Sequence, residues 1–131
     1  MTGSKIKIMI VEDESIIAMD EKFRLIKLGY EVTTIANCFE NAITGIQQNR
    51  PDLVLMDLNI KGEIKGIETA QYIWSYFNIP SLFITAYDCD DIKEKIAKLN
   101  AVGILTKPLD DFKFQKLMLT FHPLHSESLS S

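Results

Sequence analysis

Short apolar runs alternate along this chain with longer segments in which apolar residues recur every three to four positions. The most continuous run covers residues 53–56, and Asp57 follows it directly, ahead of turn-forming residues. An unbroken apolar run of this length is typical of a strand that is buried on both faces. By the same criteria the pattern predicts five strands, at residues 5–11, 30–36, 53–57, 81–85 and 102–106.

The intervening segments predict five helices, at residues 15–28, 37–48, 67–77, 88–99 and 109–121. The first of them has helical spacing at four apolar positions, Ile16, Met19, Phe23 and Ile26. Gly29 follows this helix, at a position where a glycine commonly ends one. We expect Asn37 to cap the second helix and Asp110 or Asp111 to cap the last, because these side chains accept hydrogen bonds from a first turn.

Alternation of strands and helices predicts an α/β fold with a doubly wound, five-stranded parallel sheet covered by five helices. In the flavodoxin-like strand order 2-1-3-4-5, the first and third strands are neighbours. One domain is expected at residues 5–121. The Ser-rich residues 122–131 are expected to be a flexible tail or the remnant of a linker.

Composition narrows the class of protein. The chain has 131 residues, of which 47% are hydrophobic, and its 14 basic and 18 acidic residues give a net charge of −4. No basic stretch indicates direct binding to nucleic acid, and no apolar run approaches the ~20 residues that span a bilayer. Residues 1–5 lack the apolar segment of a secretory signal, so none is expected, and Cys38 and Cys89 are expected to be free thiols. A cytoplasmic protein is therefore expected.

Polar residues follow four of the five predicted strands. Glu12 and Asp13 follow the first, Asp57 ends the third, Thr85 ends the fourth, and Lys107 follows the fifth. Each of these alone is more often a helix cap or a solvated side chain. Together they would meet at one edge, because the carboxyl ends of parallel strands share an edge of the sheet.

Three converging carboxylates repel one another, and a hard divalent cation removes that repulsion. Mg²⁺ prefers oxygen ligands, so we expect it to be held by Glu12, Asp13, Asp57 and the main-chain carbonyl of Asn59, and Mn²⁺ could replace it. The Asp57 carboxylate could then act as a nucleophile toward a phosphoryl group. Lys107 and Thr85 would neutralise and hydrogen-bond that group.

Four segments carry a resemblance to a known family: Ile10-Val11-Glu12-Asp13-Glu14, Leu55-Met56-Asp57, Ile84-Thr85-Ala86 and Leu105-Thr106-Lys107-Pro108. With these motifs the chain resembles, over about residues 5–121, the receiver domain of two-component response regulators. The resemblance implies that Asp57 is the phosphoacceptor of a histidine kinase or phosphotransfer protein. It also implies that Thr85 senses the phosphate, that Lys107 pairs with it, and that a cis bond precedes Pro108.

Three features depart from that family. Ile104 stands where the family usually has an aromatic residue, so the switch would have to repack Ile104 when Thr85 moves. The loop after Asp57 looks one residue longer and lacks the common Met-Pro, as in a variant subgroup with Lys-Gly and Gly-Ile-Glu-Thr-Ala. No DNA-binding output domain is present in this chain, so the signal is expected to pass to a downstream protein or to an output domain outside it.

The last predicted helix has more apolar residues than one buried stripe needs, Phe114 and Leu119 among them. A homodimer or partner surface on the fourth helix, fifth strand and fifth helix is one explanation. A core extended by a frayed end is the other.

Two other functions remain as alternatives. A pseudo-receiver would act as an interaction module without phosphorylation, but it typically lacks an acid or the lysine. A Mg²⁺-dependent phosphatase of the haloacid-dehalogenase type also has an aspartate nucleophile after a strand. It needs a second acid two residues later, where this chain has Asn59, and an amide cannot shuttle a proton. We therefore expect a signalling domain that catalyses only its own phosphorylation and dephosphorylation.

Overall fold

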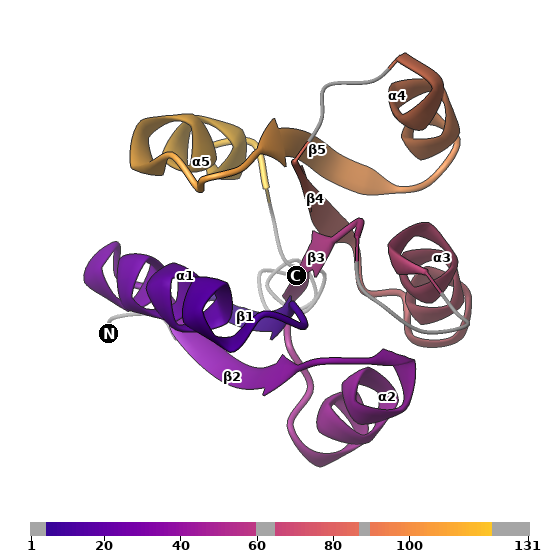
Figure 1. The fold of residues 1–131 in the computed structure, drawn as a ribbon. Helices are drawn as coiled ribbons and strands as arrows, with labels where there is room; N and C mark the ends of the chain where they lie inside the picture. The colour runs from indigo at the N-terminus through magenta and orange to yellow at the C-terminus, as the bar shows by residue number, and fades with distance from the viewer. Residues whose placement is uncertain (1–4, 60–64, 87–89, 122–131) are drawn as a thin grey trace, which may run out of the picture.

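A five-stranded parallel sheet forms the centre of the molecule (Figure 1). The computed structural model describes residues 5–59, 65–86 and 90–121, so the expected tail at 122–131 lies outside it. The strands run in the order β2-β1-β3-β4-β5. Their bounds are β1 (Lys7–Val11), β2 (Glu31–Ala36), β3 (Leu53–Asp57), β4 (Ser81–Thr85) and β5 (Ala101–Thr106). The predicted doubly wound α/β fold and its strand order are confirmed.

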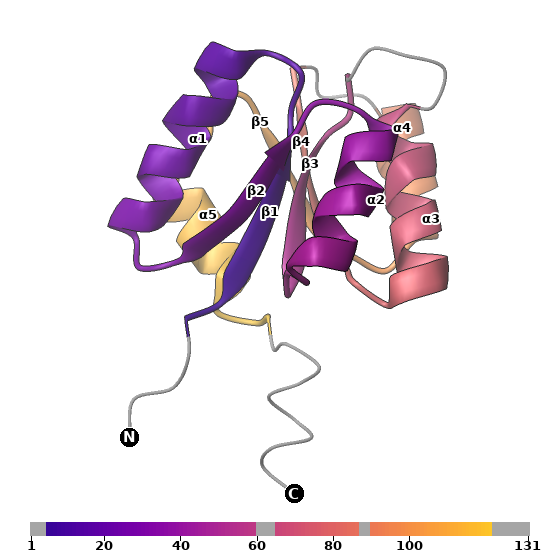
Figure 2. The ribbon, with the colours of Figure 1, turned by 90° about the horizontal axis from the view of Figure 1, so that it is seen from below.

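Five helices cover the two faces of the sheet (Figure 2). They are α1 (Ser15–Lys27), α2 (Phe39–Gln48), α3 (Gly66–Phe77), α4 (Asp90–Ala97) and α5 (Asp111–Met118). Helices α1 and α5 pack on one face, and α2, α3 and α4 pack on the other. Each face has its own apolar cluster, with Phe114 at the centre of the first and Phe83 in the second. None of the described helices is long and apolar enough to cross a bilayer.

The central strands explain why the polar residues meet. All five residues of β3 and all five of β4 are buried, as their apolar sequences predict. In the register of the sheet Val11 pairs with Met56, Asp57 with Ile84, and Thr85 with Thr106. The carboxyl ends of β1, β3, β4 and β5 are therefore level with one another.

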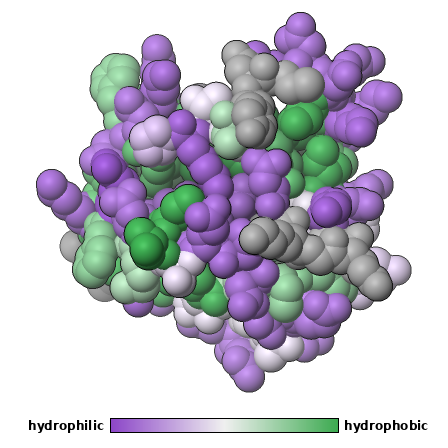
Figure 3. All heavy atoms as spheres, in the orientation of Figure 1, coloured by the Kyte–Doolittle hydropathy of each residue, from purple (hydrophilic) through white to green (hydrophobic). Residues whose placement is uncertain are grey.

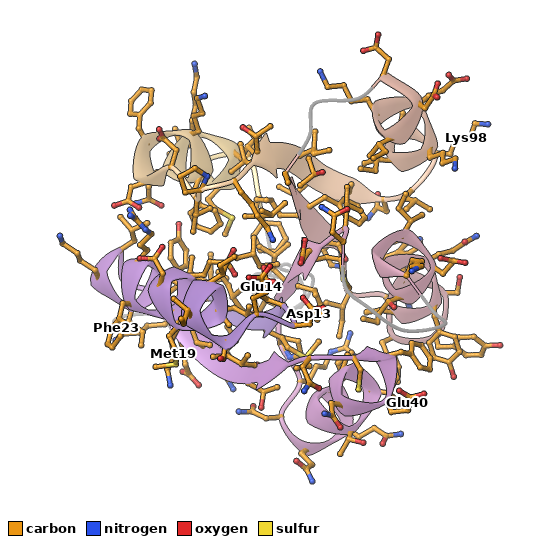
Figure 4. The ribbon with its side chains drawn as sticks, viewed as in Figure 1. Asp13, Glu14, Met19, Phe23, Glu40 and Lys98 are labelled. Carbon is orange, nitrogen blue, oxygen red and sulfur yellow. The ribbon has the colours of Figure 1, made fainter. Side chains whose placement is uncertain are left out.

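Helix α1 is where the apolar pattern predicted, but a different stripe of it is buried. Its inner face consists of Ala18, Glu21 and Leu25. The four residues that revealed the helix are all exposed, from 42% for Met19 to 85% for Ile16. Figure 3 shows apolar atoms over this part of the surface, and Figure 4 places Met19 and Phe23 on the side of α1 away from α5.

Helix ends follow the predicted signals in part. Gly29 ends α1 with φ 101°, and its N–H donates to the carbonyl of Ile26 at 3.0 Å. Asp110 caps α5, since its side chain accepts from the Lys113 N–H at 2.9 Å. Asn37 does not cap α2, which begins after Cys38 in extended backbone.

Candidate functional site

The expected acids, hydroxyl and lysine of the site lie at the carboxyl edge of the sheet. Asp57 is the last residue of β3 and Thr85 the last of β4, and both are buried. Glu12 directly follows β1 and is buried, while Asp13 is half-buried next to it. Lys107 follows β5. The structure thus brings together residues that are far apart in the sequence, as the topology predicted.

Three carboxylates form the centre of the site. One carboxylate oxygen from each of Glu12, Asp13 and Asp57 lies within 4.8 Å of the others. Figure 4 shows Asp13 near the middle of the molecule, where β1 ends. Lys107 Nζ lies 3.0 Å from Glu12 Oε1 and 3.3 Å from Asp57 Oδ1. A single ammonium group therefore bridges two of the three acids.

The donor set fits a hard divalent cation. It consists of oxygens only, as Mg²⁺ and Mn²⁺ prefer. When the acids are ionised, Lys107 offsets one of three negative charges, and the two that remain match the charge of one divalent ion. The Asn59 N–H donates to Asp57 Oδ1 at 3.1 Å, which holds this part of the loop against the acid. That the main-chain carbonyl of Asn59 binds the metal ion stays a prediction.

Two groups in the site have a raised pKa. The pKa of Glu12 is raised to about 7, because burial and the Asp57 carboxylate raise it more than the hydrogen bond from Lys107 lowers it. For Lys107, burial alone would lower the pKa, but the hydrogen bond to Glu12 and the charge of Asp57 outweigh it and raise the pKa. The Lys107 ammonium is therefore charged at neutral pH. The Glu12 carboxyl, by contrast, is protonated in about half of the molecules near pH 7 when no metal is bound.

One acid near the site was missed from the sequence. Glu21 lies on the inner face of α1 and is only 3% exposed. Burial raises its pKa to about 8, and the negative charge of Glu12 adds to the rise. A glutamate among helix-favouring residues gives no sequence signal of burial. The most apolar stripe of α1 is exposed, so the sequence pattern pointed to that stripe as the buried face and placed Glu21 in solvent.

Thr85 and Ile104 border one hollow. Thr85, Ile104, Lys93 and Lys113 line a cavity of about 200 Å³ on the side of β5. The main-chain N–H of Lys107 donates to the Thr85 carbonyl at 2.8 Å, which ties the ends of β4 and β5 together. The bond between Lys107 and Pro108 is cis, as expected. Space for Ile104 to repack therefore exists directly beside Thr85.

Comparison with known proteins identifies the family. The sequence model of the response regulator receiver domain matches residues 8–119. The transcriptional regulatory protein PdtaR of Mycobacterium tuberculosis is 32% identical over 102 residues, which cover 78% of this chain and 49% of that protein. The sensory transduction protein LytT of Bacillus cereus is 32% identical over 109 residues, or 81% of this chain and 43% of that protein. The chain spans about half or less of the length of these curated relatives.

Solved structures agree with this result. The signal receiver domain of a modulated diguanylate cyclase from Desulfovibrio desulfuricans superposes with a TM-score of 0.82 at 26% identity, covering 98% of this chain and all of that one. A CheY-like receiver domain from Methanospirillum hungatei shares the fold, with a TM-score of 0.77 at 20% identity over 88% of this chain and 92% of that one. The chain therefore belongs to the response regulator receiver domain family of two-component signalling.

Proposed function

We propose that Asp57 accepts a phosphoryl group from the phosphohistidine of a histidine kinase or phosphotransfer protein, and that the reaction depends on Mg²⁺. The observation that carries this proposal is the buried Asp57 carboxylate, which shares one ammonium group and one carboxylate cluster with Glu12. Phosphoryl transfer needs little beyond positioning and charge neutralisation, and this site offers both.

The residues have distinct roles in the transfer. A carboxylate oxygen of Asp57 attacks phosphorus, the P–N bond of the donor breaks, and the electron pair leaves with the imidazole. Lys107 neutralises charge on the phosphoryl oxygens, and the Thr85 hydroxyl donates to one of them. Glu12, Asp13, Asp57 and the Asn59 carbonyl would hold the metal ion, which supplies further charge neutralisation when bound.

The signal would leave the site through Thr85. Movement of Thr85 toward the phosphoryl group opens space that Ile104 can enter, because both border the same hollow. Ile104 lies on β5 between α4 and α5, so its repacking changes that surface. A downstream protein or an output domain outside this chain would respond to the change.

The donor has to reach the edge of the sheet where Asp57 lies. Helix α1 begins at that edge, and Ile16, Met19 and Phe23 expose apolar side chains along it. An exposed apolar stripe of this kind marks a contact surface for another protein. We therefore include this stripe in the surface that a cytoplasmic phosphodonor contacts.

The two alternatives have less support. A pseudo-receiver is disfavoured because the three acids and the lysine are present and adjacent, and the Thr85 hydroxyl is present as well. A phosphatase of the haloacid-dehalogenase type is disfavoured because Asn59 cannot act as the second acid.

Intact mass spectrometry after incubation with acetyl phosphate and Mg²⁺ tests the function directly. We expect the wild-type chain to gain about 80 Da, the mass of one phosphoryl group. Asp57→Asn and a sample with EDTA should show no gain. A wild-type chain that binds Mg²⁺ but is phosphorylated neither by acetyl phosphate nor by histidine kinases would favour the pseudo-receiver instead.

A further inference from the structure

Gly66 lies against the main chain of the expected phosphoacceptor. It is the first residue of α3 and is buried. A Cβ atom built on it would lie 2.8 Å from Leu58 Cα and closer still to the Asp57 carbonyl oxygen. Ordinary contacts of a Cβ begin at 3.4 Å, so a side chain here requires a movement of at least about 0.6 Å.

Gly66 differs in this respect from the other described glycines. At Gly45 the nearest atom to an added Cβ is the Thr34 Cγ2, and at Gly103 it is Leu117 Cδ1, both at 2.8 Å. These are side-chain atoms that can rotate or shift. At Gly66 the obstructing atoms belong to the backbone of Asp57 and Leu58, which cannot move without moving the acid.

Hydrogen bonds hold both the first turn of α3 and the end of β3. The Thr69 hydroxyl donates to the Lys65 carbonyl at 2.8 Å, and the Lys65 N–H donates to Glu68 Oε1 at 3.2 Å. Thr69 is also fully buried. The strand ladder stops at Asp57, after which only the Leu58 N–H continues it, donating to the Ile84 carbonyl at 2.9 Å. A side chain at Gly66 would therefore push the first turn of α3 and the Asp57 main chain apart.

We propose that Gly66 is a positioning residue for the phosphoacceptor: its missing side chain lets the first turn of α3 set the place of the Asp57 main chain. This inference rests on the proposed function of Asp57. Displacing a reacting group by up to ~1 Å can slow a reaction as much as 100-fold, because the reacting atoms no longer align.

Gly66→Ala in the full chain tests the proposal, with Gly45→Ala and Gly103→Ala as matched controls. We expect Gly66→Ala to lower the rate of phosphorylation by acetyl phosphate at saturating Mg²⁺ by about tenfold or more. The controls should react at the wild-type rate, because the side-chain atoms that they meet can shift without moving Asp57. A folded Gly66→Ala protein that reacts within twofold of wild type would overturn the proposal.

A second pair of variants covers the case in which Gly66→Ala does not fold. Glu68→Ala removes an acceptor from the first turn of α3, and Asp52→Ala removes the acceptor of the Lys7 N–H at the opposite end of the sheet. We expect only Glu68→Ala to slow phosphorylation. Equal rates in both would contradict the positioning role.

Mg²⁺ affinity, measured by calorimetry, separates this proposal from the proposed function. If the wild-type chain is never phosphorylated, the proposed function fails. Mg²⁺ affinity still depends on the position of Asp57 in that case, because its carboxylate belongs to the cluster that would hold the ion. Gly66→Ala, or Glu68→Ala in its place, should then weaken Mg²⁺ binding relative to its control. Unchanged Mg²⁺ affinity in that case would overturn the positioning role as well.

Discussion

Two buried glutamates should make this domain sensitive to pH near neutrality, because both have a raised pKa. Glu12 belongs to the carboxylate cluster, and Glu21 lies on the inner face of α1 among apolar residues. Burial raises the pKa of Glu12 to about 7 and that of Glu21 to about 8. Metal binding would involve only the first, whereas both affect the stability of the fold.

Mg²⁺ binding should weaken as the pH falls through 7. A metal ligand has to be deprotonated, so below the pKa of Glu12 each bound ion displaces a proton and affinity drops by up to about tenfold per pH unit. Calorimetric Mg²⁺ titrations at pH 6, 7 and 8, in buffers of different ionisation enthalpy, would show both the loss of affinity and the released proton. Glu12→Gln should bind Mg²⁺ more weakly and with less dependence on pH, and a wild-type affinity that is constant across this range would contradict the role of Glu12.

Stability should fall as the pH rises from about 4.5 to 8, partly because of Glu21. Its folded pKa is raised, so the folded state holds a proton that the unfolded state has released. This contribution is complete below the unfolded pKa and is lost as the pH passes 8, with a slope of at most about 1.4 kcal/mol per pH unit. Urea unfolding of wild type and Glu21→Gln at pH 5.5, 7 and 8.5 isolates it, because both proteins keep Glu12. Parallel pH profiles for the two proteins would show that Glu21 does not titrate in this range.

Helix α1 shows what an apolar pattern can and cannot predict at the scale of one element. The 3.6-residue period correctly predicts the helix, and Gly29 correctly predicts its end. The pattern does not tell which of two stripes is buried, because Ala18 and Leu25 form a second apolar stripe. The more hydrophobic stripe is the exposed one, which is why we assign it to contact with another protein.

Replacing the exposed stripe should affect partner contact and leave the fold intact. Met19→Gln with Phe23→Gln should change the free energy of unfolding by no more than about 0.5 kcal/mol per site, because both side chains are exposed. The rate with acetyl phosphate should stay at the wild-type value, while transfer from a phosphotransfer protein that phosphorylates the wild type should slow.

Leu25→Ala is the control for the effect on stability, because it changes a buried residue of the same helix. Leu25 is fully buried, so its truncation should cost about 2–5 kcal/mol of stability. Equal transfer rates from the protein donor to wild type and to the double glutamine variant would remove the stripe from the docking surface.

At the scale of the whole molecule, the sequence predicts most of the fold and which polar residues meet at one edge of the sheet. Strands that end in Asp57 and Thr85 are specified by their apolar runs, and the parallel topology brings their ends together. The contact of Gly66 with Asp57 and the burial of Glu21 could not be predicted, because both depend on how helices pack against the sheet. The loop at 60–64 and the residues at 87–89, which adjoin the site, lie outside the described residues.

Helix α5 exposes only part of the apolar surface that its sequence predicts for a homodimer or partner. Phe114 is fully buried in the core, whereas Phe112 and Leu119 are 75% and 80% exposed. Together with Tyr30 they line a hollow of about 470 Å³ beside α5. Phe112→Glu with Leu119→Glu should keep the phosphorylated protein monomeric, whereas phosphorylated wild type should sediment as a dimer. Wild type that sediments as a monomer before and after phosphorylation would argue against this surface.

Lys107 provides the resting site with a cation of its own, because its ammonium lies 3.0 Å from Glu12 and 3.3 Å from Asp57. This cation is tethered to the fold, so its local concentration is fixed, whereas that of Mg²⁺ follows the surrounding solution. Together with one bound divalent ion, the Lys107 ammonium would bring three ionised carboxylates close to electrical neutrality. Without the ion, two of these three negative charges would stay unbalanced, so under magnesium shortage the supply of the ion would limit the proposed transfer as much as the supply of donor.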